Sequence, residues 1–207
     1  MSNCFGQTTN KSLKLFDSLP DNSIKTLTNP KPLSDAEYFS LDSTHSTLIS
    51  TKRNLDEQTF RLTLNSKTTA YFFYYTEQLN SKDSSFSHFN FYLKLNDSVC
   101  YLSPNFSYPN CCFEKILAVS FSDINSDGFT DIVVLGQFYR GYGKMEQKYS
   151  PQYIFDIYFG SKNKFITDRK TIDRLAIDTD KQITIDDIKK AYAKQLQTLH
   201  RQEKHYR

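Results

Sequence analysis

The chain has 207 residues, which is enough for one domain of ordinary size and short for two. Apolar residues make up 38% of it, but 17 Phe and 14 Tyr supply enough buried area for a core, which argues against disorder over the whole chain. The net charge of +3 comes mainly from the segment that begins at Lys181. This basic density is too low to indicate a nucleic-acid binder, and no run is apolar enough for a membrane span.

The first 34 residues are rich in Ser, Thr, Asn and Pro, which predicts a linker or irregular lead-in before a single β-rich domain over residues 35–207. Residues 1–7 have neither a charged nor an apolar region, so they do not form a signal peptide. Either the protein is cytoplasmic, or it is exported and its signal has been removed. Cys4 favours export, because a lone Cys before a polar tether resembles the lipidated Cys of a mature bacterial lipoprotein, although Asn3 replaces the small residue usual there. The alternative for Cys4 is an exposed thiol.

The body of the chain alternates strand-like runs with polar turns. β-Branched and aromatic residues dominate these runs, and some of the runs place apolar side chains at every second position. We therefore expect a mostly β, α+β fold built on an antiparallel sheet. The predicted strands cover residues 47–51, 59–64, 69–75, 89–95, 115–121, 131–138 and 153–159.

Three further cysteines flank a Pro- and Asn-containing loop over residues 103–110. Cys100 precedes the loop and Cys111 and Cys112 follow it, so a strand, loop and strand arrangement can bring them within bridging range. A disulfide from Cys100 to Cys111 or Cys112 would contribute about 2–3 kcal/mol to stability. Reduced, half-buried thiols are the equal alternative, and the spacing does not predict a zinc site.

An acidic loop over residues 123–131 carries the clearest chemical signal. Its oxygen-bearing side chains stand at alternate positions of a turn and at the start of the next strand; they are Asp123, Asn125, Asp127 and Asp131. A calcium ion takes six to eight oxygen ligands, which alternate residues of a tight turn can direct to one side. Gly128 permits a positive φ, and the Phe129 carbonyl can supply a backbone ligand. We therefore predict one Ca²⁺ here in preference to Mg²⁺; an ion-free turn held by Asp and Asn side chains is the alternative.

The pattern Asp-x-Asn-x-Asp-Gly-x-x-Asp-Ile-Val-Val between two predicted strands resembles the calcium loops of FG-GAP and VCBS-type repeats. It departs from an EF-hand, because Val134 stands where the bidentate Glu would be and strands replace the helices. The motif occurs once, whereas a propeller needs several blades. The resemblance therefore implies one calcium-bearing hairpin within another β fold.

The residues after the loop extend the resemblance over about residues 115–167. A Tyr- and Gly-rich stretch at 136–143 and an Ile-Tyr-Phe strand follow the loop, as in single-copy VCBS-like envelope lipoproteins of Gram-negative bacteria. Some of these lipoproteins are immunity proteins against secreted antibacterial toxins. The resemblance implies a protein of the periplasm or cell envelope, attached to the membrane only through a lipid anchor, with a cognate toxin as its protein partner.

The sequence pattern of the C-terminal segment predicts an amphipathic helix over residues 184–200. Thr184 and Asp187 have the spacing of a capping box. Apolar residues then recur at three- and four-residue intervals from Ile185 to Leu199, with lysines off that stripe. We expect this helix to pack on the sheet and to keep a basic face in solvent.

Catalytic motifs are not recognisable in the sequence. The four His lie outside nucleophile and metalloprotease patterns, and the acidic cluster fits a cation site better than a general acid and base. The residues after the loop are of types favoured at protein interfaces, and the predicted interface residues are Phe138, Tyr139, Arg140, Tyr142 and Tyr149. We therefore expect a non-enzymatic, exported, calcium-binding protein that binds another protein. A glycan- or peptidoglycan-binding envelope module that stacks sugars on the tyrosines is the alternative, and a hydrolase is a weaker one.

Overall fold

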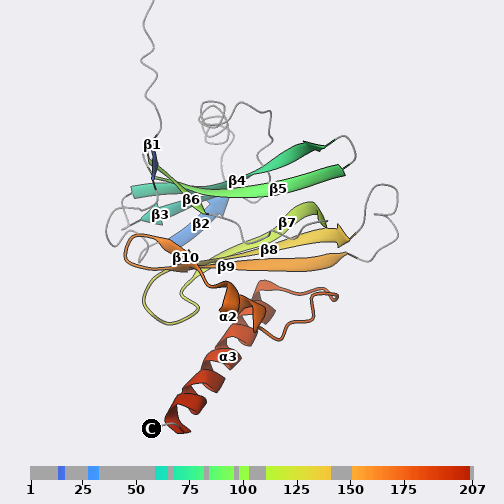
Figure 1. The fold of residues 1–207 in the computed structure, drawn as a ribbon. Helices are drawn as coiled ribbons and strands as arrows, with labels where there is room; N and C mark the ends of the chain where they lie inside the picture. Colours follow the sequence, from blue (N-terminus) through green and yellow to red (C-terminus); the bar gives the residue numbers. More distant parts are fainter. Residues whose placement is uncertain are drawn as a thin grey trace, which may run out of the picture.

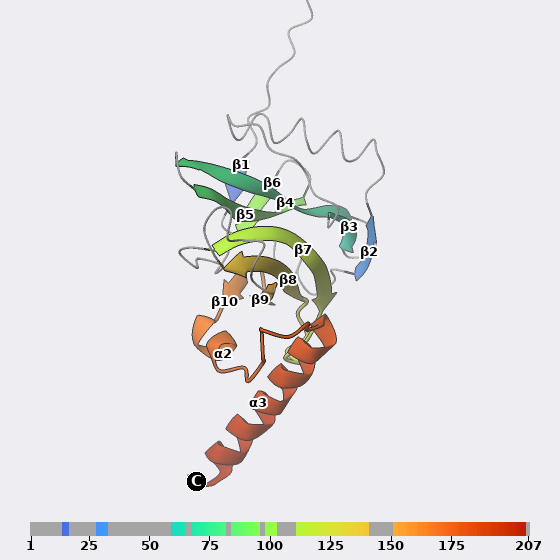
Figure 2. The same ribbon diagram turned by 90° about the vertical axis from the view of Figure 1, so that its right-hand side faces the viewer.

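Two β-sheets and a layer of helices form the part of the chain that the computed structural model describes (Figure 1). That part comprises residues 14–16, 28–32, 59–64, 68–81, 84–95, 98–102, 111–140 and 151–205. A six-stranded sheet lies against one face of a four-stranded sheet, and the helices cover the other face (Figure 2). The mostly β, α+β class predicted from the sequence is confirmed.

The six-stranded sheet has the strand order β1-β6-β5-β4-β3-β2. Its strands are β1 (Lys14–Phe16), β2 (Thr28–Pro32), β3 (Phe60–Leu64), β4 (Thr68–Ser81), β5 (Ser84–Leu95) and β6 (Ser98–Leu102). All neighbours pair antiparallel except β1 and β6, which are parallel. Its centre is the long β4–β5 hairpin, in which residues 70–81 pair with residues 84–95 without a break.

The four-stranded sheet has the order β10-β9-β8-β7 and is antiparallel throughout. Its strands are β7 (Cys111–Ser122), β8 (Asp131–Arg140), β9 (Gln152–Gly160) and β10 (Phe165–Thr167). The helices that cover it are α2 (Arg169–Asp173) and α3 (Ile185–His205). The acidic loop joins β7 to β8 and therefore lies at one end of this sheet.

Two apolar cores lie on opposite faces of the four-stranded sheet. The inter-sheet core contains Leu62, Ala70, Phe72, Tyr74, Phe91, Leu93, Leu95, Cys100, Leu102, Ile116, Ile132, Val134, Phe138, Ile154 and Tyr158. The helix-side core contains Val133, Leu135, Phe155, Ile157, Ile172, Leu175, Ile183, Ile188 and Tyr192. Successive residues of β8 alternate between the two cores, which explains why its sequence is apolar without interruption: a strand buried on both faces needs no polar side.

The first 34 residues contribute two strands, where the sequence predicts an irregular lead-in. β1 pairs with β6 and β2 pairs with β3, so both segments belong to the six-stranded sheet. β2 reads Thr-Asn-Pro-Lys-Pro and lies at the edge of the sheet, where a missing backbone N–H is tolerated. Because β2 carries no apolar alternation, hydrophobic periodicity does not reveal it.

The predicted strands in the body are confirmed except at their ends and at residues 47–51, which lie outside the described residues. The largest difference is at the β4–β5 hairpin, where the polar residues after Thr76 continue the ladder. Backbone groups make that ladder, so it extends past the point where the apolar pattern stops.

The C-terminal helix begins where the sequence predicts. The Thr184 hydroxyl accepts a hydrogen bond from the Asp187 N–H at 3.2 Å, and the Asp187 carboxylate accepts one from the Thr184 N–H at 2.9 Å. This reciprocal pair is the predicted capping box. The helix continues to His205, beyond the predicted end at residue 200. The short helix α2, capped by Asp168, is not predicted from the sequence.

Candidate metal centre

The acidic loop makes a tight turn between β7 and β8. Two of its residues have positive φ, 62° at Ser126 and 86° at Gly128. A Cβ at residue 128 would have no atom within 4 Å, so glycine is favoured there by backbone conformation and not by lack of space. Ser126 adopts the left-handed region although it has a side chain, which is a local strain that the loop's hydrogen bonds must hold in place.

The side chains of Asp123, Asn125 and Asp127 all turn toward the backbone of the loop. Asp123 Oδ1 accepts from the Asp127 N–H at 3.2 Å, and its Oδ2 accepts from the Gly128 N–H at 2.9 Å. Asn125 Oδ1 accepts from the Asp127 N–H at 3.1 Å, and Asn125 Nδ2 donates to Asp127 Oδ2 at 2.9 Å. Asp127 Oδ1 accepts from the Phe129 N–H at 2.9 Å. The alternate positions predicted as ligands therefore share one side of one turn.

Asp131, at the start of β8, is a buried carboxylate with 0% of its surface exposed. Its Oδ2 accepts from the Ile124 N–H and its Oδ1 from the Gly160 N–H, each at 2.8 Å. It thus ties the acidic loop to the end of β9. Burial raises its pKa to about 6, against the lowering effect of the two backbone N–H groups, and Asp127 and Asp123 raise it further.

The oxygen donors of the acidic loop are of the kinds that a hard divalent cation prefers. They are three carboxylates, one amide oxygen and the backbone carbonyl of Phe129, and calcium binds oxygen ligands of these kinds. In the described residues, three His, Cys, Asp or Glu side chains do not come close enough together to hold a metal ion. The loop acids instead accept backbone N–H groups, and each carboxylate oxygen keeps a second lone pair. Ion binding therefore requires these carboxylates to turn or share their oxygens.

The predicted cysteine sites are only partly described. Cys100 lies in β6 with 3% of its surface exposed, and its thiol donates toward the Tyr101 carbonyl at 3.9 Å. Its sulfur forms no disulfide in the part of the chain that the structure describes. Cys111 and Cys112 begin β7, but their side chains, like the whole of Cys4, lie outside the described residues. The disulfide and the lipidation of Cys4 stay predictions.

Of the predicted interface residues, only Phe138 has a described side chain. It is 5% exposed and belongs to the inter-sheet core, so it is a packing residue that offers little surface to a partner. Tyr139 and Arg140 complete β8, but their side chains lie outside the described residues, as do Tyr142 and Tyr149 entirely.

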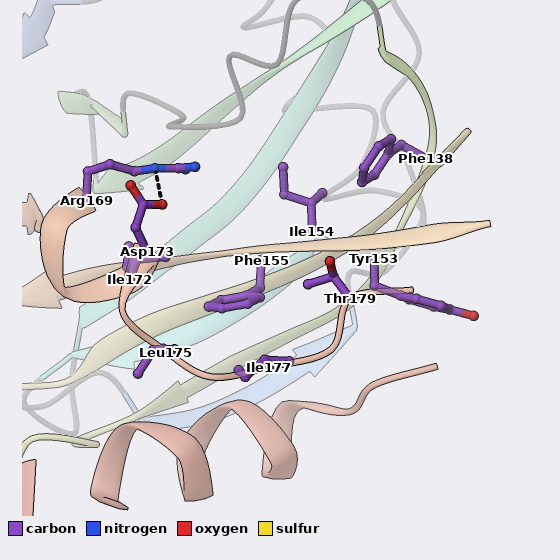
Figure 3. Close-up of a pocket in the computed structure, with 10 residues that line it drawn as sticks. All are labelled: Phe138, Tyr153, Ile154, Phe155, Arg169, Ile172, Asp173, Leu175, Ile177 and Thr179. Carbon is purple, nitrogen blue, oxygen red and sulfur yellow. Dashed lines mark ion pairs between the residues drawn. The ribbon is translucent and has the colours of Figure 1, made fainter. Parts of the chain in front are cut away.

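Phe138 also lines a pocket of about 190 Å³ beside β9 (Figure 3). The other lining residues are Tyr153, Ile154, Phe155, Arg169, Ile172, Asp173, Leu175, Ile177 and Thr179. Ile154 and Phe155 point to opposite sides of β9, and the Arg169 Nε pairs with Asp173 Oδ1 at 2.7 Å (Figure 3). The pocket thus combines apolar side chains with polar surface and one charged pair, and Phe138 is the predicted interface residue among those that line it.

Asp156 is a second buried carboxylate, and sequence reasoning did not single it out. Strand alternation places it on β9 between Ile154 and Tyr158, which both face the inter-sheet core. Burial, then the charge of Asp156, raises the pKa of the Tyr158 hydroxyl well above its ordinary value. A single Asp within an apolar strand belongs to no recognisable sequence motif, so its burial becomes evident only from the fold.

Comparison of the chain with protein-family models, curated proteins and solved structures finds no match. Among the described residues, none of the helices combines the length and apolar character needed to span a membrane.

Proposed function

We propose that this protein is a non-enzymatic calcium-binding protein that holds one Ca²⁺ in the acidic loop. The observation that carries the proposal is a fully buried carboxylate, Asp131, at the end of a turn that presents three more oxygen side chains. Asp123 and Asp127 lie close enough to raise the pKa of Asp131, so the loop concentrates negative charge that a cation would offset. Bound calcium would supply that positive charge, with Asp123, Asn125, Asp127, Asp131 and the Phe129 carbonyl as its protein ligands.

Calorimetry on protein stripped with EGTA tests this proposal. Titration with Ca²⁺ is expected to give saturable heat with one ion per chain. Mg²⁺ is expected to bind about tenfold more weakly or worse, because it needs a strict octahedron and gives up its water reluctantly. If neither ion produces saturable heat, the acidic loop is an ion-free turn and the proposal is wrong.

We further propose that the protein acts in the periplasm or cell envelope by binding another protein, most concretely as an immunity protein that occludes a secreted toxin. The resemblance of the loop and the strands after it to envelope lipoproteins supports this, and Cys4 provides a lipidation site for such a location. The pocket beside β9 adds a recess of mixed polarity, with Arg169 and Asp173 as a charged pair and Tyr153 as a half-buried aromatic. Aromatic residues and Arg are the usual anchors of protein interfaces.

The partner proposal is tested with the product of the gene next to the one that encodes this chain. We expect one-to-one binding, and we expect Tyr153→Ala and Arg169→Ala each to weaken it about tenfold or more, the effect of losing an interface anchor. Ile166→Ala is the matched control, because Ile166 is 46% exposed on β10 and lies outside the pocket. A neighbouring product that neither binds nor kills contradicts the immunity role, and retention on purified peptidoglycan favours the glycan-binding alternative.

A further inference from the structure

The acidic loop reaches the helix-side core, on which α3 packs, through the side chain of Ile124. The Ile124 N–H donates to Asp131 Oδ2, so this residue belongs to the hydrogen-bonded loop. Its side chain packs against the helix-side core, to which α3 contributes Ile188 and Tyr192. Any change that orders or loosens the loop therefore acts on a side chain of the same core on which α3 packs.

A second connection runs from Asp131 through the end of β9. Asp131 Oδ1 accepts from the Gly160 N–H, and the preceding residue, Phe159, places its ring 5.4 Å from the ring of Tyr192 on α3. The pKa of Tyr192 is raised, first by burial and then by Asp131, Asp168 and Asp127, so its hydroxyl lies in the field of the loop acids. Asp131 is thus the common point of both connections to the helix.

Among the described side chains of α3, those that pack on the helix-side core lie between Ile185 and Leu196. Ile188 is 0% and Tyr192 is 6% exposed, whereas Leu199 is 37% exposed. Within the described part of the helix, Leu196 is the last residue packed against the helix-side core. Figures 1 and 2 both show the C-terminal half of the helix leaving the body of the protein. A helix held by about three turns responds strongly to the loss of one anchoring contact.

We propose that calcium binding in the acidic loop tightens the docking of α3, through Ile124 and through the Gly160–Phe159 end of β9. This inference rests on the proposed function. Ion binding and helix docking then share a coupling free energy, so each strengthens the other by the same factor. The ion-free protein keeps its sheets and samples a state in which α3 is released.

Hydrogen–deuterium exchange on the full chain, with Ca²⁺ or with EGTA, tests the coupling. Backbone amides in residues 188–196 are expected to exchange at least about fivefold more slowly with calcium than with EGTA. A factor of about five is the lower end of the usual range of coupling strengths. Amides around Phe72 and Phe73, at 0% exposure in the six-stranded sheet, are expected to change little. Calcium binding without slower exchange in α3 overturns the coupling and leaves the proposed function standing. Absence of calcium binding overturns both.

A truncation that spares every oxygen ligand separates the coupling from ion binding itself. Ile124→Ala is expected to keep saturable calcium binding and to lose most of the calcium response of α3. Ile124 is only partly buried, so the Ile124→Ala variant is expected to fold, which circular dichroism checks. The calcium response of α3 in Ile124→Val is expected to lie between those of the wild type and Ile124→Ala. Leu199→Ala is the matched control on the undocked half of α3. A full α3 response in Ile124→Ala contradicts the role of this side chain.

Discussion

Calcium is expected to raise the melting temperature of the wild-type protein by about 5–10 °C, and Asp127→Ala is expected to abolish that rise. An ion at one hundred times its Kd stabilises the folded state by about 2.7 kcal/mol, and for a chain of this size each kcal/mol shifts Tm by about 2–4 °C. Asp127 is exposed, and its removal costs the ion-free protein two exposed hydrogen bonds within the turn, from the Phe129 N–H and from Asn125 Nδ2. The variant therefore stays folded while it loses a charged ligand.

Asp178→Ala is the control for that experiment. Asp178 is also an exposed acid in a turn, and its carboxylate accepts from the Asp180 N–H at 3.2 Å. The substitution removes the same charge and the same kind of hydrogen bond outside the acidic loop, together with an exposed ion pair to Lys181, so the calcium-induced rise is expected to remain. Scanning calorimetry with Ca²⁺ and with EGTA measures both variants. An equal rise in wild type and Asp127→Ala contradicts the assignment of the loop as the calcium site.

The sequence predicts the elements that apolar side chains define. The run Ile132-Val133-Val134-Leu135 identifies a buried strand, and the spacing of Thr184 and Asp187 identifies the start of α3. The edge strand β2 and the polar end of the β4–β5 hairpin escape this reasoning, because backbone pairing holds them and their side chains show little apolar pattern. Pattern analysis detects regular alternation of apolar and polar residues, and the sequences of these segments show little of it.

In the candidate metal centre, the contacts between residues close in sequence are predictable, and the contacts between distant residues are not. The turn at Asp123, Asn125 and Asp127 is local, so the spacing of oxygen side chains and one glycine suffices to predict it. The second partner of Asp131 is the N–H of Gly160, 29 residues away, which depends on the pairing of β8 with β9 and leaves no mark in either segment. The link from Ile124 to α3 likewise appears only when the helix is placed on the sheet.

The metal-free protein is expected to lose stability as the pH rises from about 4 to about 6, because of Asp131. Its pKa in the folded state is about 6, against 3.8 for an unperturbed Asp. Within that window the folded protein binds more protons than the unfolded chain, so the free energy of unfolding falls as the pH increases. A shift of this size corresponds to about 3 kcal/mol. Hydrogen bonds lower the pKa values of three other acids, Asp168, Asp178 and Asp187. The ionised forms of these acids stabilise the folded state, and that stabilisation is lost at pH values below this window.

Urea unfolding of EGTA-treated protein at pH 4.5, 5.5 and 7 measures this dependence. Saturating Ca²⁺ is expected to flatten or reverse it, because a cation beside Asp131 favours the ionised carboxylate and competes with the proton. Asp131→Asn is expected to remove the dependence in EGTA. It also leaves one of the Ile124 and Gly160 N–H groups without a carboxylate acceptor, at a cost of about 1–3 kcal/mol. If the metal-free wild type is instead most stable at pH 7, the buried carboxylate is compensated in the folded protein and the electrostatic case for a cation there is lost.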